Sequence, residues 1–151
     1  MPTVSRSRVV AAIPEHVWDV VANPDRLTEW WPNVQRVEES DGKAWTTVLS
    51  SPKGGRLLRA DYSLVASEHP RRRSWRHEVA ASPFEHVLTD SVTDIRLEPV
   101  EGGTEVQISE EMGLRGVSRL GGGQVKRAAK RKLDGALDGL ERLFAAREAN
   151  D

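Results

Sequence analysis

Two side chains stand out as able to transfer protons, a glutamate and a histidine on separate strand-like segments. Between Thr104 and Met112 apolar and polar residues alternate, and Glu110 falls on the same side as Val106 and Ile108. Successive side chains of a strand point to opposite faces of its sheet, so this carboxylate is predicted to face inward. Burying an unpaired carboxylate is costly. Glu110 therefore needs a partner, a water-filled pocket or a catalytic task.

The histidine, His77, alternates with Trp75 and Val79 and is predicted to share their inner face. A carboxylate close to an imidazole tunes it for proton transfer near neutral pH, so His77 and Glu110 could act as an acid–base pair. The alternative is that they pair with each other, or with Tyr62, only to satisfy buried polar atoms. Structural ion pairs also perturb titratable groups, so both interpretations stay open.

Other chemistries find little support in the residue types. The chain has no cysteine, which excludes thiolate metal sites, disulfides and a cysteine nucleophile. Of the four histidines, His69 and His77 lie eight residues apart across a turn, and His16 and His86 are isolated. None of these spacings is typical of a metal site. We therefore expect neither a metal nor a cofactor.

The elements that position these side chains are predicted from apolar spacing and turn residues. From Val34 to Glu98 the alternation has a period of two, and Asp41-Gly42 and His69-Pro70 are among the turn signals. No connection is long enough for a crossover helix, so the strands are predicted to form an antiparallel meander. The predicted strands are Thr3–Ile13, Val34–Glu39, Ala44–Ser50, Arg56–Ser67, Arg72–Ala80, His86–Glu98 and Thr104–Met112.

Helices are predicted before and after the meander in the sequence. Pro14 suits the first turn of a helix that stops at Asn23-Pro24, and a second short helix is predicted over Asp25–Trp31, capped by Asn23 or Asp25. The segment Gln124–Arg147 would form a helix about 36 Å long, enough to cross a small domain. Its apolar residues recur at steps of three and four and would share one face: Val125, Ala129, Leu133, Ala136, Leu137, Leu140 and Phe144.

This order of elements resembles the helix-grip fold of the START/Bet v 1 superfamily. Three segments are similar to its bacterial polyketide cyclase/dehydrase-like branch: IPEHVWDVVANPDRLTEWWP from Ile13, GGTEVQISEEM from Gly102 and KRKLDGALDGLERLF from Lys130. The resemblance implies an α+β fold, in which a curved antiparallel seven-stranded sheet surrounds a long C-terminal helix and two short helices follow the first strand. The superfamily includes lipid carriers as well as cyclases, so the fold leaves the activity open.

Alternation also predicts which side chains line the space between sheet and helix. The strands contribute a mixed set, in which Ser91 and Thr93 continue a face that also holds Val87 and Thr89. Trp30 and Trp31 are adjacent and must face different ways, so one is predicted in the core and the other at the cavity mouth. The predicted lining is Tyr62, Trp75, His77, Ser91, Thr93, Glu110 and Met112, with Trp30 or Trp31 and with Leu133 or Leu137.

An apolar chamber with a few converging polar groups is typical of a small-molecule site. The leading hypothesis is binding of a hydrophobic or amphipathic small molecule, such as a lipid or a polyketide-like or aromatic compound. Entry is expected between the long helix, the Leu114–Gly123 segment and the strand tips. The resemblance also permits a cyclase, aromatase or dehydratase that uses His77 and Glu110. A third hypothesis is a regulatory or interaction domain.

The third hypothesis comes from charge on the long helix. Between Gly113 and Leu133 there is no acidic residue but seven basic ones. Positive charge at a helix N-terminus opposes the helix dipole, so a role for it is worth considering. An acidic lipid or protein partner could bind Lys126, Arg127, Lys130 and Arg131, although a solvated face is the simpler interpretation. Without interleaved aromatic residues, nucleic acid is an unlikely partner.

Length and composition bound the remaining possibilities. A chain of 151 residues with a net charge of −1 suits one domain, over residues 1–151, and has no global attraction to nucleic acid or membrane. The N-terminus lacks the apolar region of a secretory signal, so we expect a cytoplasmic protein, either monomer or homodimer. Gly135 and Gly139 each weaken the long helix, which predicts a close backbone approach there, to the sheet or to another subunit.

Overall fold

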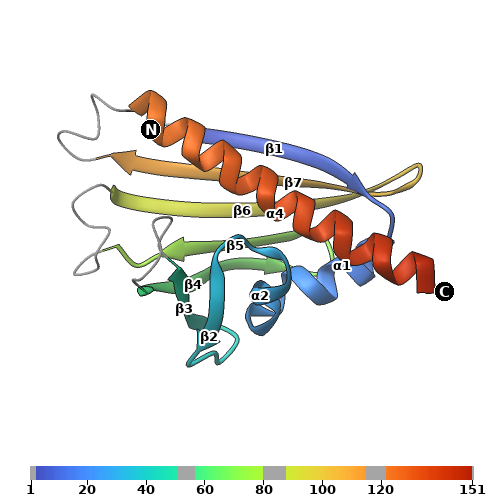
Figure 1. Ribbon diagram of the computed structural model, residues 1–151, viewed down its shortest axis with the longest axis horizontal. Coiled ribbons are helices and arrows are strands. Elements are labelled where there is room, and N and C mark those ends of the chain that lie inside the picture. Colours follow the sequence, from blue (N-terminus) through green and yellow to red (C-terminus); the bar gives the residue numbers. More distant parts are fainter. Residues whose placement is uncertain (1–2, 51–56, 80–87, 115–121, 151) are drawn as a thin grey trace.

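The computed structural model describes residues 3–50, 57–79, 88–114 and 122–150. Its strands form one antiparallel sheet of seven, in the order β1-β7-β6-β5-β4-β3-β2, so the first strand of the chain lies beside the last (Figure 1). The strands are β1 Thr3–Val10, β2 Val34–Glu38, β3 Ala44–Ser50, β4 Leu57–Glu68, β5 Arg72–His77, β6 Leu88–Val100 and β7 Gly103–Leu114.

Two helical segments follow β1, as predicted. Helix α1 (Pro14–Val21) has proline in its first turn, where the missing N–H costs nothing, and it buries an apolar side. The predicted second helix is divided into a short 3-10 helix (Pro24–Arg26) and helix α2 (Leu27–Trp30). The Asn23 side chain accepts a hydrogen bond of 3.1 Å from the backbone N–H of Asp25, which confirms the predicted cap.

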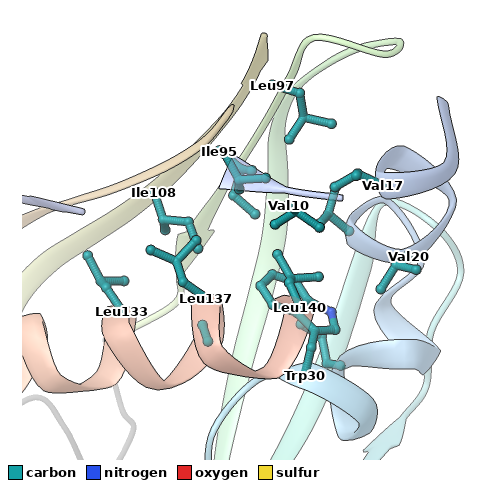
Figure 2. Close-up of a cluster of buried hydrophobic side chains, with 14 of the residues drawn as sticks. Val10, Val17, Val20, Trp30, Ile95, Leu97, Ile108, Leu133, Leu137 and Leu140 are labelled. Carbon is teal, nitrogen blue, oxygen red and sulfur yellow. The ribbon is translucent and has the colours of Figure 1, made fainter. Parts of the chain in front are cut away.

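The long helix, α4 (Gly122–Asn150), crosses one face of the sheet, and α1 and α2 lie near its C-terminal half (Figure 1). Figure 2 shows Leu133, Leu137 and Leu140 of α4 directed toward side chains of the sheet, among them Ile95 and Ile108. All five are fully buried. The three- and four-residue steps along the helix thus produce the core, because they place these leucines on one face. The helix-grip architecture predicted from the sequence is confirmed.

Several boundaries differ from the prediction. Strand β1 ends at Val10 instead of Ile13, because the chain turns there: the Ala12 N–H bonds to the Val10 carbonyl and the Ala12 carbonyl accepts from Thr104. Helix α4 extends beyond both predicted ends. The predicted strand ends at Arg56, Ala80 and His86 lie outside the described residues.

Gly135 and Gly139 of α4 do mark a close approach, but to α2 and the turn after it. A Cβ atom at Gly139 would lie 2.4 Å from the Trp30 carbonyl oxygen, and one at Gly135 would lie 2.9 Å from a Pro32 ring carbon. Neither contact is with the sheet. The glycines therefore allow the segment Trp30–Pro32 to lie directly against the helix, and this segment carries Trp31.

Ion pairs join acidic residues of α4 to β1, which is an edge strand of the sheet. Arg6 of β1 lies 3.5 Å from Asp134, and Arg8 pairs with both Asp138 and Glu141 of the helix. These side chains are exposed or half-buried, so each pair contributes at most about 1 kcal/mol. Together they orient α4 about its own axis, with Asp134, Asp138 and Glu141 toward β1.

Candidate functional site

A cavity of about 640 Å³ lies between the sheet, the N-terminal half of α4 and the turn that follows α2. Strands β3 to β7 supply its floor, with Trp45, Trp75 and Thr93 among the residues that line it. Helix α4 contributes Ala128, Arg131, Lys132 and Gly135. Ala128 and Arg131 are exposed on the outer surface as well, so the cavity reaches solvent beside this part of the helix.

Most of the wall is aromatic or aliphatic. Trp75 makes edge contacts with Trp31 and Trp45, at ring-centroid distances of 5.7 and 5.8 Å. Tyr62 is stacked with Trp45 on one side and with His77 on the other, at 6.1 and 4.9 Å. Such contacts hold large rings in fixed orientations. The result is a rigid wall against which a flat or extended apolar molecule could pack.

The polar part of the cavity centres on Glu110. This carboxylate is only 3% exposed, and both of its oxygens contact the ammonium of Lys132, at 2.9 and 2.7 Å. The buried carboxylate of Glu110 is therefore paired with Lys132 of α4. The partners considered from the sequence were His77 and Tyr62. Ser91, Thr93 and Thr47 add hydroxyl groups to the lining.

His77 and Tyr62 stand beside this ion pair. Burial lowers the pKa of His77 below its ordinary value, and the Lys132 cation lowers this pKa further, while nearby carboxylates act in the opposite direction. Burial and the Glu110 carboxylate both raise the pKa of the Tyr62 phenol. At neutral pH the site therefore holds a neutral imidazole, which can accept a proton, and a protonated phenol, which can donate a hydrogen bond.

The structure brings together seven of the side chains that were predicted to line the cavity. They are Trp31, Tyr62, Trp75, His77, Ser91, Thr93 and Glu110. The side chains of Val87 and Thr89, expected on the same face, lie outside the described residues.

Four other predicted lining residues lie in the hydrophobic core: Trp30, Met112, Leu133 and Leu137. Trp30 is directed inward because its backbone lies against Gly139, which leaves Trp31 for the cavity wall. Leu133 and Leu137 are buried between α4 and the sheet (Figure 2). Alternation and helical periodicity assign a residue to the inner face, but they do not say which part of that face is filled and which is hollow.

Sequence reasoning missed several residues of the site. Trp45, Thr47 and Leu49 line the cavity from β3, where the same alternation would have found them. Lys132 was counted only as one of the seven basic residues between Gly113 and Leu133, yet it follows Ala129 by three positions and so lies at the edge of the buried stripe. Arg73 does not line the cavity but contacts its wall: it is 6% exposed and lies over the Trp45 ring, 5.8 Å from the ring centroid.

The described residues set limits on other kinds of site. In these ranges no three His, Cys, Asp or Glu side chains gather closely enough to hold a metal ion. None of the described helices combines the length and apolar character needed to cross a lipid bilayer. What the fold and site define is a helix-grip protein with a chamber of mixed lining that opens to solvent beside α4.

A comparison with protein families identifies the group to which the chain belongs. Residues 1–145 match the family described as polyketide cyclase / dehydrase and lipid transport, and the chain is a member of that family. The match spans the sheet, the short helices and most of α4. A comparison with curated proteins found no significant match.

Solved structures share the fold at low sequence identity. XoxI from Bacillus cereus superposes with a TM-score of 0.78 at 19% identity, over 98% of this chain and 99% of that one. CV1439 from Chromobacterium violaceum gives 0.76 at 19% identity, over 94% and 96%. The di-domain ARO/CYC StfQ from the steffimycin biosynthetic pathway gives 0.76 at 15% identity, over 99% of this chain and 52% of StfQ. At these identities the likeness establishes the fold alone.

Proposed function

We propose that the protein binds an amphipathic small molecule, of lipid, polyketide-like or aromatic type, in the cavity under α4. The observation that carries the proposal is the division of the lining into an aromatic wall, formed by Trp31, Trp45 and Trp75, and a polar centre at Glu110 and Lys132. The apolar body of the ligand would pack on the tryptophans. A hydroxyl, carbonyl or acidic group would hydrogen-bond to the polar centre.

Size and family membership support this proposal. The cavity volume of about 640 Å³ lies within the range of pockets that enclose drug-sized ligands. The family to which the chain belongs includes lipid transport by its own description. Burying an apolar molecule against three indole rings would supply most of the binding free energy, because the hydrophobic effect scales with the apolar area removed from water.

The test is a pair of substitutions on α4 that differ only in their relation to the cavity. Ala128→Trp would put an indole at the mouth, whereas Ala145→Trp would put one on an exposed site of the same helix away from it. Titration with the neutral apolar probe N-phenylnaphthylamine should give a large fluorescence increase for the wild type and for Ala145→Trp. Ala128→Trp should weaken binding by about tenfold or more, which corresponds to roughly 1.4 kcal/mol.

Probe binding that is equally strong in both variants would place the probe elsewhere and would contradict the proposal. Absence of binding to the wild type would do the same. Circular dichroism of each variant controls for folding, since both substitutions lie on exposed positions of one helix.

A second candidate function is cyclisation or dehydration of a polyketide-like chain in the same cavity. It is favoured by His77, whose lowered pKa leaves a neutral imidazole facing the cavity beside the Glu110–Lys132 pair. A neutral imidazole can remove a proton from carbon next to a carbonyl, and the Lys132 ammonium could stabilise the oxyanion that forms. The chain's resemblance in fold to the ARO/CYC StfQ is compatible with this chemistry.

The catalytic candidate is tested with a linear poly-β-ketone as substrate, followed by mass spectrometry for loss of one water molecule. The wild type should form the dehydrated cyclic product faster than the uncatalysed solution does, and His77→Gln should reduce that rate by roughly two to four orders of magnitude if the imidazole is the general base. Glu110→Gln is the companion variant. Full turnover in both variants would exclude an essential role for either residue and leave ligand binding alone.

A further inference from the structure

The N-terminal half of α4 carries a cluster of positive charge. Lys126, Arg127, Lys130 and Arg131 are all exposed, and we call these four residues the basic patch. None of the ion pairs found among the described residues involves any of the four. Lys126 and Lys130, and likewise Arg127 and Arg131, are like charges four residues apart, which destabilise the helix unless something anionic binds there.

Three acidic residues of the same helix lie at the edge of the sheet. Asp134, Asp138 and Glu141 pair with Arg6 and Arg8 of β1 at the edge of the sheet. Helix α4 is thus divided by charge along its length. Its acidic positions hold it to β1, while the basic patch faces solvent.

The basic patch is continuous with the mouth of the cavity. Arg131 belongs to the patch and also lines the cavity, and Ala128, which lies between Arg127 and Lys130 in sequence, lines it too. An anionic surface that contacts the patch would therefore cover or adjoin the opening. An apolar ligand dissolves poorly in water and partitions into lipid bilayers. A bilayer that contains acidic lipids also presents a large anionic surface. We therefore take such a bilayer as the partner of the patch.

We propose that the basic patch docks on the surface of an anionic lipid bilayer and thereby places the cavity mouth against it, where the ligand would enter or leave. The attraction is electrostatic and peripheral. Each Lys or Arg held near an anionic membrane surface is worth about a fivefold gain in affinity. Four such residues are enough for salt-sensitive, reversible binding. The choice of a bilayer rests on the proposed function, although the interaction surface itself lies outside the ligand site and does not depend on which ligand occupies it.

The experiment is vesicle co-sedimentation of the full chain. Vesicles of phosphatidylcholine alone are compared with vesicles in which about one third of the lipid is phosphatidylglycerol, at low salt and again at high salt. The test variant is Lys126→Gln, Arg127→Gln and Lys130→Gln combined, which leaves the cavity-lining Arg131 in place. The control combines Lys43→Gln, Arg59→Gln and Arg71→Gln, exposed basic residues on loops and strands away from the patch.

We expect the wild type to sediment with the anionic vesicles only, and high salt to release it, because salt screens exposed charges. The patch variant should bind at least about twentyfold more weakly, as three residues are lost. The control variant should bind like the wild type, although it has lost the same net charge.

Three results would overturn the inference. They are no binding of the wild type to anionic vesicles, equal loss of binding in the patch and control variants, and retention on polyglutamate-coated beads without binding to vesicles. The last would indicate an acidic protein as the partner. N-phenylnaphthylamine binding in solution, measured on the same variants, is expected to be unchanged, so failure here is separable from failure of the cavity proposal.

Discussion

At the scale of single residues, the site depends on one cation meeting one buried carboxylate. Glu110 is almost fully buried, whereas the side chain of Lys132 remains 39% exposed. The pair is therefore open to solvent on the helix side and closed on the sheet side. This geometry lets a ligand's polar group replace water at the ammonium without leaving the carboxylate unpaired.

The pKa of His77 reports the charges of the site, because Lys132 and Glu110 both act on it. Because Lys132 lowers the pKa of His77 and Glu110 raises it, Lys132→Met should raise this pKa, and Glu110→Gln should lower it further. The measurement is an NMR titration of the imidazole resonances, with His77→Gln used to assign the signal. Shifts of the same sign in both variants would contradict the geometry described here.

The same residue makes stability depend on pH. The pKa of His77 is lower in the folded chain than in the unfolded chain, so between the two values the unfolded chain binds more protons. Stability from this source is present above the unfolded value of 6.5 and is lost as the pH falls toward the folded value. His77→Gln should therefore show a smaller drop in the urea midpoint between about pH 7 and about pH 5 than the wild type does.

The inward orientation of Glu110 could be predicted from the sequence, but its ion-pair partner could not. Alternation along β7 depends on neighbouring residues alone, so the inward carboxylate was predictable. Lys132 comes from a helix, and its contact with Glu110 depends on the angle and register at which that helix crosses the sheet. For the same reason Lys132 was not among the partners considered for Glu110 from the sequence, which were His77 and Tyr62.

At the scale of elements, the contact between α2 and α4 decides where Trp31 lies. Helix α4 has no side chain at Gly135 or Gly139, and the chain from Trp30 to Pro32 fits against the helix at these two positions. Trp30 then packs in the core, and the neighbouring Trp31 contacts Trp75 in the cavity wall. Gly135 and Gly139 lower the helix propensity of α4, but they allow the close contact with Trp30–Pro32 that places Trp31 in the aromatic wall.

Gly139→Ala tests this contact. The added methyl carbon would lie 2.4 Å from the Trp30 carbonyl oxygen, so α2 must move. We expect a net loss of about 1–3 kcal/mol in the free energy of unfolding, despite the better helix propensity of alanine. Denaturant unfolding measures the loss, and N-phenylnaphthylamine affinity reports the displaced Trp31.

The matched control is Gly123→Ala, at an exposed position of the same helix where an added methyl group meets nothing within 4 Å. It should leave probe binding unchanged and be neutral or slightly stabilising. Equal effects of the two substitutions would mean that helix propensity, and not the contact with α2, governs the region.

Elements were the best-predicted level of the structure. Periods of two and of three to four residues identified the strands and the long helix, because these periods follow from backbone geometry. The contact made by the glycines was predicted only in part. A glycine pair indicates a close approach, but the partner, here α2 instead of the sheet, is set by how the elements assemble.

At the scale of the whole molecule, α4 has two halves with different roles. Leu137, Leu140 and Phe144 in the C-terminal half are buried in the core. Ala128, Arg131 and Lys132 in the N-terminal half cover the cavity, and the basic patch lies beside them. The N-terminal half also contributes Ala129 and Leu133 to the core, so the cavity lies beside a continuous core instead of replacing part of it.

The most direct test of the central claim, that the cavity holds an amphipathic molecule, is native mass spectrometry of protein purified without added ligand or detergent. We predict a discrete mass excess from a retained small molecule, which disappears under denaturing conditions and is reduced in Ala128→Trp but not in Ala145→Trp. Recovery of the bare chain mass from all three proteins, with no uptake of N-phenylnaphthylamine by the wild type, would contradict it.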